Sequence, residues 1–259
     1  VDYDLDGDLD LFVANNLGNS FPADDNALYR NDDGVFVRVT DTVLGQDGAE
    51  AVSTSWADYD NDGDPDCFVA TQNWNDATNL LYRNEGDGTF TQVTGIDVVT
   101  DDLNSFGSEW VDVDNDGWID LTVTANESDN DFNRIYRNNG DGTFTSISGT
   151  AYTDDEEGSF GQAWADYDGD GRLDVFVTTQ SDPDQLYRNT TDNGNHWVAL
   201  RLHGLDSTTD GLGARVVVTA GGITQTRWHT GTRGGYCGSL RPLHFGLGAD
   251  ATIDAVEIH

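Results

Sequence analysis

A nine-residue acidic loop that occurs four times constrains the fold of this chain more than any other feature. The copies read DYDLDGDLD, DYDNDGDPD, DVDNDGWID and DYDGDGRLD, and they begin at residues 2, 58, 112 and 166. Successive copies therefore start 56, 54 and 54 residues apart. Because this spacing is nearly constant, we infer that one structural unit is repeated and that each copy carries the same loop.

Each loop has the ligand pattern of a site for a hard cation. Positions 1, 3, 5 and 9 are Asp in all four copies, and position 6 is always Gly. Alternate side chains then converge on one point, glycine allows the tight reversal, and the backbone carbonyl of position 7 completes an oxygen shell. We therefore predict about four Ca²⁺ sites. The predicted side-chain ligands are Asp2, Asp4, Asp6, Asp10, Asp58, Asp60, Asp62, Asp66, Asp112, Asp114, Asp116, Asp120, Asp166, Asp168, Asp170 and Asp174, and the predicted carbonyl ligands are Asp8, Asp64, Trp118 and Arg172.

The loop begins like an EF-hand, but its surroundings predict β-structure. An EF-hand has a Glu at position 12 and lies between two helices, whereas here a strand-like apolar run follows each loop, for example at 67–69 and 121–123. A run that bears Trp precedes the loop, and a Tyr-Arg-Asn element and a GDGTF turn follow it. Four short strands per repeat predict an all-β fold, a β-propeller-type array.

The predicted repeats fill the first 194 residues, at approximately 1–50, 51–104, 105–158 and 159–194. The first repeat lacks an opening strand and the last lacks the GDGTF turn, so both are incomplete. Since Val1 lies inside a repeat and no signal peptide is visible, we expect a processed or truncated chain. Three arrangements remain open: a fragment of a larger ring, a small closed ring, and an array that another chain completes.

Residues 195–259 have a different character from the repeats. The acidic loops are absent there, and five strand-like runs take their place. Apolar and other residues alternate at 198–202, and the pair Gly221-Gly222 marks a hairpin. We predict a small C-terminal β-domain over 195–259.

The charge balance excludes several classes of function. The chain has 48 acidic and 12 basic residues, a formal net charge of −36, and its basic residues are all Arg. A Schiff-base lysine and a P-loop lysine are therefore excluded. So acidic a surface disfavours nucleic acid and anionic membranes as partners, and no apolar run approaches the roughly 20 residues of a membrane span.

The sequence offers no catalytic constellation. The repeated carboxylates are committed to metal, and the five histidines all lie in the C-terminal part without metal-ligand spacing. Ser239 does not lie in a nucleophile elbow. We therefore expect that the protein is not an enzyme and name no catalytic residue.

The cysteines, the repeated Arg and two sequons are further features of the sequence. A buried thiol is the expectation for Cys67, and a bridge from Cys67 to Cys237 is the alternative. The repeated Arg of the Tyr-Arg-Asn element either pairs with a loop carboxylate or faces solvent. Asn126 and Asn189 head N-glycosylation sequons in polar connections where we expect a glycan to be accommodated.

Two parts of the chain resemble known families. The SFG runs at 105–107 and 159–161, with the D-x-D-x-D-G-x-x-D loop, are similar to FG-GAP/VCBS repeats, which form calcium-binding blades in integrin α-subunits and many secreted bacterial proteins. The runs NHWVALRL at 195–202, GLGARV at 211–216 and LHFGLG at 243–248 resemble the ASPIC/UnbV domain. The resemblance implies an extracellular, calcium-stabilised propeller with adhesion or matrix roles and the same ligand positions. Such propellers usually have seven blades, and only about four repeats are present.

The leading functional hypothesis is an extracellular structural or adhesive protein in which calcium holds the repeats together. Its unpaired strand edges predict self-assembly into a fibre or larger particle. The predicted partners are a second copy of the chain, an extracellular protein or a glycan. The alternatives are a calcium-dependent carbohydrate-binding module, which would use loop carboxylates and Trp74 or Trp118, and, less favoured, a polysaccharide-active enzyme.

Overall fold

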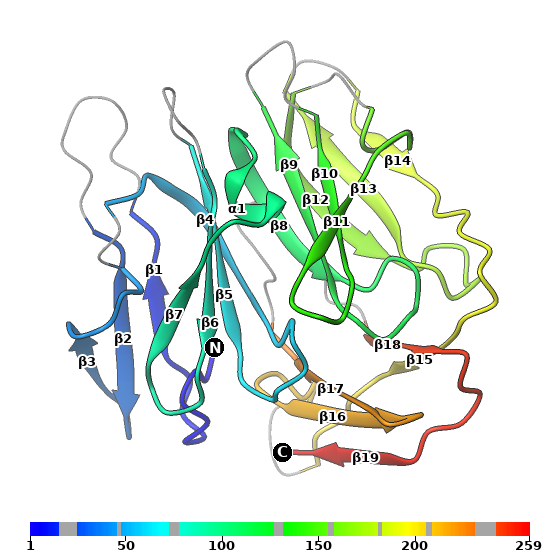
Figure 1. Cartoon of the computed structure of the whole chain (residues 1–259). Coiled ribbons are helices and arrows are strands. Elements are labelled where there is room, and N and C mark those ends of the chain that lie inside the picture. Colours follow the sequence, from blue (N-terminus) through cyan, green and yellow to red (C-terminus); the bar gives the residue numbers. More distant parts are fainter. Residues whose placement is uncertain are drawn as a thin grey trace.

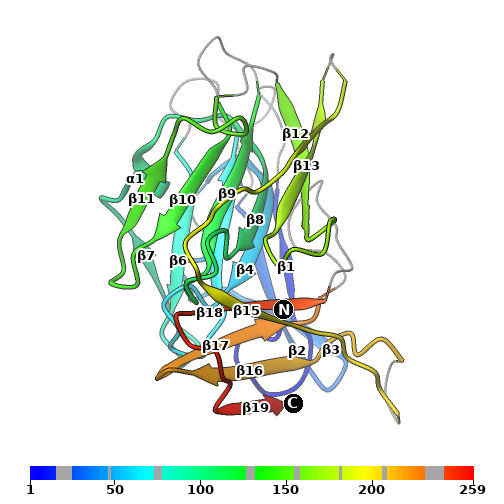
Figure 2. The same cartoon turned by 90° about the vertical axis from the view of Figure 1, so that its right-hand side faces the viewer.

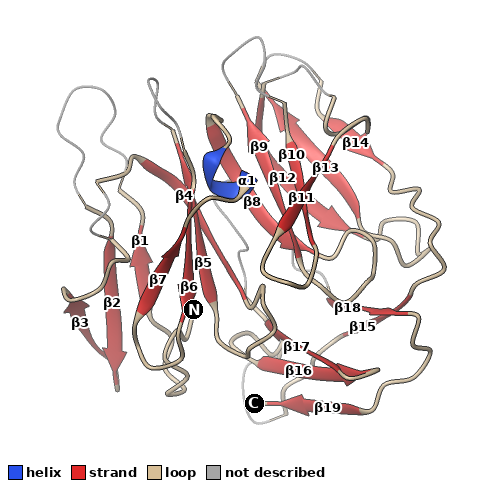
Figure 3. Cartoon of the chain, in the orientation of Figure 1, coloured by secondary structure: helices blue, strands red, loops and turns tan. Residues whose placement is uncertain are grey.

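The computed structural model describes most of the chain. The described residues are 1–15, 25–45, 48–72, 78–126, 132–154, 158–180, 183–205, 209–230 and 242–259. Within these ranges strands dominate (Figure 3), and the helix that they contain, α1 (Asp97–Thr100), is a single turn. No helix in the described part of the chain is both long enough and apolar enough to cross a membrane.

Four antiparallel sheets follow one another along the repeat region (Figure 1). Each is a meander in which strands adjacent in sequence are also paired in space. Sheet 1 contains β1 (Leu11–Val13), β2 (Ala27–Asp32) and β3 (Val35–Val39); sheet 2 contains β4 (Ala51–Ala57), β5 (Asp66–Thr71), β6 (Leu80–Asn84) and β7 (Phe90–Val93); sheet 3 contains β8 (Ser105–Val111), β9 (Asp120–Ala125), β10 (Arg134–Asn138) and β11 (Phe144–Ile147); sheet 4 contains β12 (Ser159–Ala165), β13 (Asp174–Thr179) and β14 (Gln185–Tyr187).

The register of the sheets repeats as closely as the sequence does. The Trp of the first strand lies opposite the first apolar residue after the loop in all three sheets that have this strand: Trp56 opposite Cys67, Trp110 opposite Leu121, and Trp164 opposite Val175. The predicted all-β fold is therefore confirmed. Sheets 2 and 3 have the expected four strands, and the described part of sheet 1 begins with the strand after the loop.

Neighbouring sheets pack face to face, and the core lies between them. Their first strands β4, β8 and β12 contact one another in turn. Between sheets 2 and 3, Trp110 stacks on Tyr59 with ring centroids 6.0 Å apart and contacts Phe68 edge-on at 6.5 Å. Equivalent apolar clusters lie between sheets 1 and 2 and between sheets 3 and 4. Burial of these large side chains supplies the main driving force for assembling the array.

An Asn at or just after the end of the third strand clamps sheets 2, 3 and 4 to the sheet before each of them. In sheet 3, Asn138 Nδ2 donates to the carbonyl of Ile119 in its own loop at 3.1 Å and to that of Tyr59 in the preceding loop at 2.7 Å. Asn84 and Asn189 make the same two bonds in sheets 2 and 4. Each clamp satisfies two carbonyls that packing would otherwise bury without partners.

The C-terminal strands form two small sheets packed against each other. One sheet pairs β15 (His196–Leu200) with β18 (Leu243–Gly248), and the other has the order β17 (Ile223–Trp228), β16 (Arg215–Ala220), β19 (Ala255–Ile258). Val216, Val218 and Phe245 fill the space between them. Figures 1 and 2 place this C-terminal unit, β15 to β19, across the ends of sheets 2 to 4.

The structure bears differently on the cysteines and the sequons. Cys67 is buried in sheet 2, as expected, but Cys237 lies outside the described residues, so the bridge stays a prediction. Glycosylation at the two sequons stays a prediction, and both asparagines are held within the fold. Asn126 is only 2% exposed, and Asn189 uses its Nδ2 for the clamp, with bonds of 2.8 and 3.2 Å. A glycan on either amide would displace buried contacts.

We predict that Asn138→Ala destabilises the protein by about 2–4 kcal/mol, because the carbonyls of Tyr59 and Ile119 lose their donor while buried. The matched control is Asn31→Ala, since Asn31 Nδ2 donates to Leu9 O in its own loop at 3.0 Å and sheet 1 has no described sheet before it. We expect a loss of about 1 kcal/mol for the control. Urea unfolding of both variants measures the difference, and equal losses would refute the clamp.

Candidate metal centres

The four acidic loops, here loops 1 to 4 in chain order, have the same internal hydrogen bonds. The carboxylate of position 1 accepts the amide of the glycine at position 6, over 2.9 to 3.1 Å in all four loops. The carboxylate of position 5 accepts the amide of position 7 over 2.9 to 3.0 Å. Glycine is required at position 6 because φ there lies between 88° and 102°, where a Cβ is strained.

The Asp at position 9 fixes each loop to its sheet. One of its oxygens accepts a hydrogen bond from the backbone N–H of position 2. The other accepts one from the backbone N–H of the Asn that follows Tyr-Arg, and the distances are 2.7 to 3.2 Å across the four loops. In sheet 3, for example, Asp120 joins Val113 to Asn138. Position 9 therefore links the loop to the Asn clamp, and through that clamp to the neighbouring sheet.

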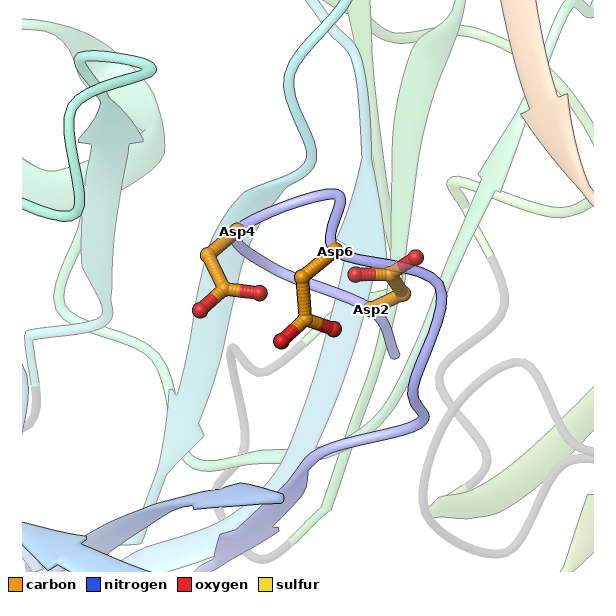
Figure 4. A group of neighbouring side chains, drawn as sticks. All are labelled: Asp2, Asp4 and Asp6. Carbon is orange, nitrogen blue, oxygen red and sulfur yellow. The ribbon is translucent and has the colours of Figure 1, made fainter. Parts of the chain in front are cut away.

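Each loop brings three carboxylates together. In loops 1 and 2 the groups come from positions 1, 3 and 5, namely Asp2, Asp4 and Asp6 and their equivalents Asp58, Asp60 and Asp62. One oxygen from each member of a group lies within 4.8 Å of the others, and Figure 4 shows the three side chains of loop 1 side by side. In loops 3 and 4 the groups come from positions 1, 3 and 9: Asp112, Asp114 and Asp120, and Asp166, Asp168 and Asp174.

Burial destabilises the charged forms of several loop carboxylates. Burial raises the pKa of Asp58 to about 7, and burial together with the charge of Asp62 raises the pKa of Asp60 to about 6. In loop 3, burial and then the charge of Asp116 raise the pKa of Asp112 to about 7. Asp58 is fully buried, yet its Oδ1 accepts no hydrogen bond, and Oδ1 of both Asp2 and Asp4 is likewise buried without a partner. A cation among these oxygens satisfies them, so the donor set fits a metal.

The arginine of the Tyr-Arg-Asn element divides the loops into two kinds. Arg137 contacts Asp114 and Asp116 of loop 3 at 2.8 and 3.0 Å, and Arg188 contacts Asp168 and Asp170 of loop 4 at 2.7 and 3.0 Å. Arg30 and Arg83 instead pair with the acidic residue two positions on, Asp32 and Glu85. The repeated Arg therefore pairs with loop carboxylates in loops 3 and 4 and with an acidic residue outside the loop in the other two repeats. In loops 3 and 4 its guanidinium contacts the position-5 carboxylate, and the Asp at position 9 is the third member of the carboxylate group.

The structure brings together most, but not all, of the predicted ligands as a group. Positions 1 and 3 belong to a group in every loop, whereas positions 5 and 9 alternate between the two kinds of loop. The position-7 carbonyls of Asp8, Asp64, Trp118 and Arg172 stay a prediction, since these residues contact their own loops through their amides. The clamping Asn was not predicted, although its repetition after Tyr-Arg was a visible signal.

The family comparison agrees with this architecture. A model described as an FG-GAP-like repeat matches residues 2–69, 58–123 and 112–177, and each match runs from one acidic loop to the strand after the next. The chain belongs to the FG-GAP-like repeat family. Residues 204–259 match a second model, described as ASPIC and UnbV. No curated protein matches the chain.

This pair of matches defines the class of protein. FG-GAP-like repeats build propeller-type arrays, so the sheets of the repeat region are called blades 1 to 4 below. The combination of FG-GAP-like repeats with an ASPIC/UnbV domain is that of an adhesion-like extracellular repeat protein.

We predict that Arg137→Gln lowers the melting temperature by about 2–4 °C in chelator and by less in calcium. Loss of the guanidinium leaves Asp114 and Asp116 to repel each other, a cost of about 1 kcal/mol for a partly exposed pair. A bound cation would supply the missing charge. The control is Arg83→Gln, whose partner Glu85 lies outside the loop. Equal effects of the two substitutions in chelator would contradict this role of Arg137.

Proposed function

We propose that the protein is an extracellular structural or adhesive protein whose blades are held together by calcium. The observation that carries the proposal is the Oδ1 atom of Asp58, a fully buried acceptor without a partner in a loop whose geometry recurs four times. The loops lie at the corner between the first and second strands of each repeat, where they act as structural staples. The proposal includes about four Ca²⁺ ions, one per loop.

The donor set favours calcium over other metals. Each loop offers carboxylate and carbonyl oxygens, which are the ligands of hard cations, and the groups contain neither His nor Cys. Ca²⁺ accepts six to eight oxygens in irregular geometry, whereas Mg²⁺ is smaller and requires a near-octahedral shell. Extracellular modules bind Ca²⁺ with dissociation constants on the order of 10⁻⁴–10⁻³ M, so millimolar calcium outside a cell would keep such loops occupied.

Calcium binding at the loops would strengthen the whole array rather than one corner. Position 9 of each loop also holds the amide of the clamping Asn, and that Asn bonds the preceding loop. Ordering of Asp120 by a cation therefore orders Asn138, and through it the contact between blades 2 and 3. The same chain of contacts runs through Asp66 and Asn84 to blade 1.

We predict that EDTA lowers the melting temperature by more than about 10 °C and that added Ca²⁺ restores it, because binding to the folded state alone contributes about 1.4 kcal/mol per site at a tenfold excess over Kd and the contributions of about four sites add. Titration calorimetry should give a stoichiometry near four. Asp62→Asn, at ligand position 5, should remove one site, whereas Asp64→Asn, with the same loss of charge at position 7, should retain it. An unchanged melt in EDTA would refute the proposal.

The proposed adhesion includes self-association through two faces that match. Blade 4 exposes Tyr167, Phe176 and Leu186, at 55%, 42% and 54%. Their equivalents in earlier blades face the next blade. The rings of Tyr3 and Tyr59 lie 5.8 Å, centroid to centroid, from those of Phe90 and Phe144 respectively. The rings of Phe12 and Phe68 lie 5.9 and 6.5 Å from those of Trp56 and Trp110. We call Tyr167, Phe176 and Leu186 the tail face.

Blade 1 exposes the complementary side. Phe36 is 53% exposed, although it is equivalent to Phe90 and Phe144, which are buried against the preceding blade. Val35 and Val37 beside it are also exposed, at 63% and 44%. Since side chains alternate along a strand, Val35 and Val37 lie on the other side of β3 from Phe36. We call the side of β3 that bears Phe36 the head face. Since the contacts of blade 1 with blade 2 and of blade 2 with blade 3 each join the Tyr of one loop to the Phe of the next blade, we propose that a second copy seats its tail face on this head face.

We predict concentration-dependent association in millimolar Ca²⁺, measured by sedimentation velocity, because burying the head and tail faces removes apolar surface from water. Phe36→Asp and Tyr167→Asp should each abolish growth beyond the monomer. Mixing the two variants should restore a dimer and nothing larger, since one variant keeps its tail face and the other its head face. A wild-type protein that stays monomeric at high concentration would contradict head-to-tail association.

The two alternative functions stay predictions. Trp118 is half-buried, and its ring lies against Gly140, where a Cβ would come within 2.5 Å of it, so it is not an open platform for a sugar. Trp74 lies outside the described residues. For a polysaccharide-active enzyme, the loop carboxylates would have to serve both as metal ligands and as an acid–base pair.

A further inference from the structure

The C-terminal unit rests on loop 3, and Asn115 is the centre of the contact. Asn115 is only 4% exposed and has a φ of 60° at position 4 of the loop. Its Oδ1 lies 2.7 Å from His244 Nε2, and its carbonyl accepts the amide of Gly248 at 2.9 Å. His244 and Gly248 both belong to β18. One loop residue therefore holds the strand through its side chain and through its backbone.

The backbone of β18 packs so closely on loop 3 that no side chain fits at Gly246. A Cβ at Gly246 would overlap Oδ2 of Asp112 and lie 2.5 Å from the backbone of Asn115. Asp112 is the position-1 carboxylate, and the same Oδ2 accepts the amide of Gly117. The backbone of β18 is thus in direct contact with a proposed calcium ligand, and a shift of Asp112 moves the surface on which the strand lies.

Residues of β15, the partner strand of β18, and residues just before it extend the same contact. Asn193 and Asn195, just before β15, donate their amides to the carbonyl of Asp114 at 2.6 and 2.9 Å. Trp197 of β15 stacks on His244, with ring centroids 5.6 Å apart, and a Cβ at Gly171 in loop 4 would overlap its ring. The C-terminal unit therefore contacts loop 3 at positions 1, 3 and 4 and also touches loop 4.

Position 4 also connects one loop to the next. Asn115 Nδ2 donates to the carbonyl of Gly171 in loop 4 at 3.0 Å, and Asn61 Nδ2 donates to that of Gly117 in loop 3 at 3.4 Å. These two asparagines form equivalent bonds between loops, but Asn115 alone of the pair also bonds β18 in the described structure. The pair therefore separates a contact between loops from a contact between domains.

A buried cation of the C-terminal unit also lies at this contact. Arg227 of β17 is only 4% exposed, and its positive charge acts on both Asp58 and Asp112. Its guanidinium also lies over the ring of Phe245, 5.6 Å from the centroid. The C-terminal unit thus brings a buried cation beside two loops in a chain with a net charge of −36.

We infer that loop 3 is an interdomain calcium site, and that its cation and the docking of the C-terminal unit stabilise each other. The inference rests on the proposed calcium binding and adds to it the role of the C-terminal unit, a cap that the third calcium holds in place. The physical link is the shape of the loop. A cation fixes Asp112, Asp114 and Asn115 in the arrangement that β18 contacts, whereas without it the carboxylates repel and the loop relaxes. By thermodynamic reciprocity, a weaker dock lowers the affinity of loop 3 for calcium by the same factor.

Hydrogen exchange of the full chain, with Ca²⁺ and with EDTA, tests the first half of the inference. In EDTA the peptides covering 196–200 and 243–248 should exchange at least about tenfold faster. That factor corresponds to a decrease of about 1.4 kcal/mol in their free energy of opening. The peptides covering 215–220 and 255–258 belong to the other sheet of the C-terminal unit, and their exchange should change less. If calorimetry shows calcium binding but the exchange of 243–248 does not depend on calcium, the inference is wrong. If no calcium binds, the proposed function fails first.

Two substitutions test the second half in saturating and limiting calcium. Asn115→Gly keeps the positive φ and removes the side chain, and Asn61→Gly is the matched control with the same change in loop 2. His244→Phe keeps a ring on Trp197 and removes the nitrogen that meets Asn115. We expect Asn115→Gly and His244→Phe each to weaken one calcium step by about fivefold or more and Asn61→Gly to leave the exchange of 243–248 unchanged. Calcium isotherms of Asn115→Gly and His244→Phe that match that of Asn61→Gly would overturn the inference.

Discussion

Carboxylates that converge without a counter-charge are the constraint on which the rest of this structure depends. Ligand atoms of three carboxylates lie within 4.8 Å of one another in each loop, and two unit charges at that distance repel by about 3 kcal/mol at an effective dielectric constant near 20. The fold nevertheless buries Asp58, Asp112 and Asp120 almost completely. Within each loop, backbone amides oppose this cost, and in loops 3 and 4 an arginine adds to them. A divalent cation would convert the repulsion into the strongest contact of the corner.

The loops have this importance because each is joined to its neighbours by polar contacts at fixed positions. Position 9 holds the Asn that clamps the preceding blade, and position 4 reaches the next loop where it is Asn. Apolar packing between blades is non-directional and tolerates displacement, whereas these hydrogen bonds fix the spacing of the blades. The array is therefore a series of apolar interfaces whose register is set at the acidic loops, the proposed calcium sites.

The two ends of the array and the C-terminal unit give this scaffold its specificity. Side chains whose equivalents are buried between other blades are exposed on the head and tail faces, through which we propose that the array is extended. The C-terminal unit lies across the loops and contacts loop 3 through backbone atoms of β18, where Gly246 leaves no space for a side chain. The proposed calcium site, blade packing and domain docking thus meet at Asp112 and Asn115.

The sequence by itself determined the features that are local and repeated. Ligand spacing, the glycine at position 6 and the strand after each loop depend on neighbouring residues and on the constant period, so the all-β repeats and the candidate ligands followed from them. The tertiary structure decided the features that depend on distant residues. Arg137 lies on its loop whereas Arg83 turns to Glu85, because Asn139 supplies no charge where Glu85 does, and the amide of Asn189 is consumed by the clamp rather than left for a glycan. The contact of His244 with Asn115 joins residues 129 positions apart, and no local pattern encodes such a pair, because only the packing of two domains brings them together.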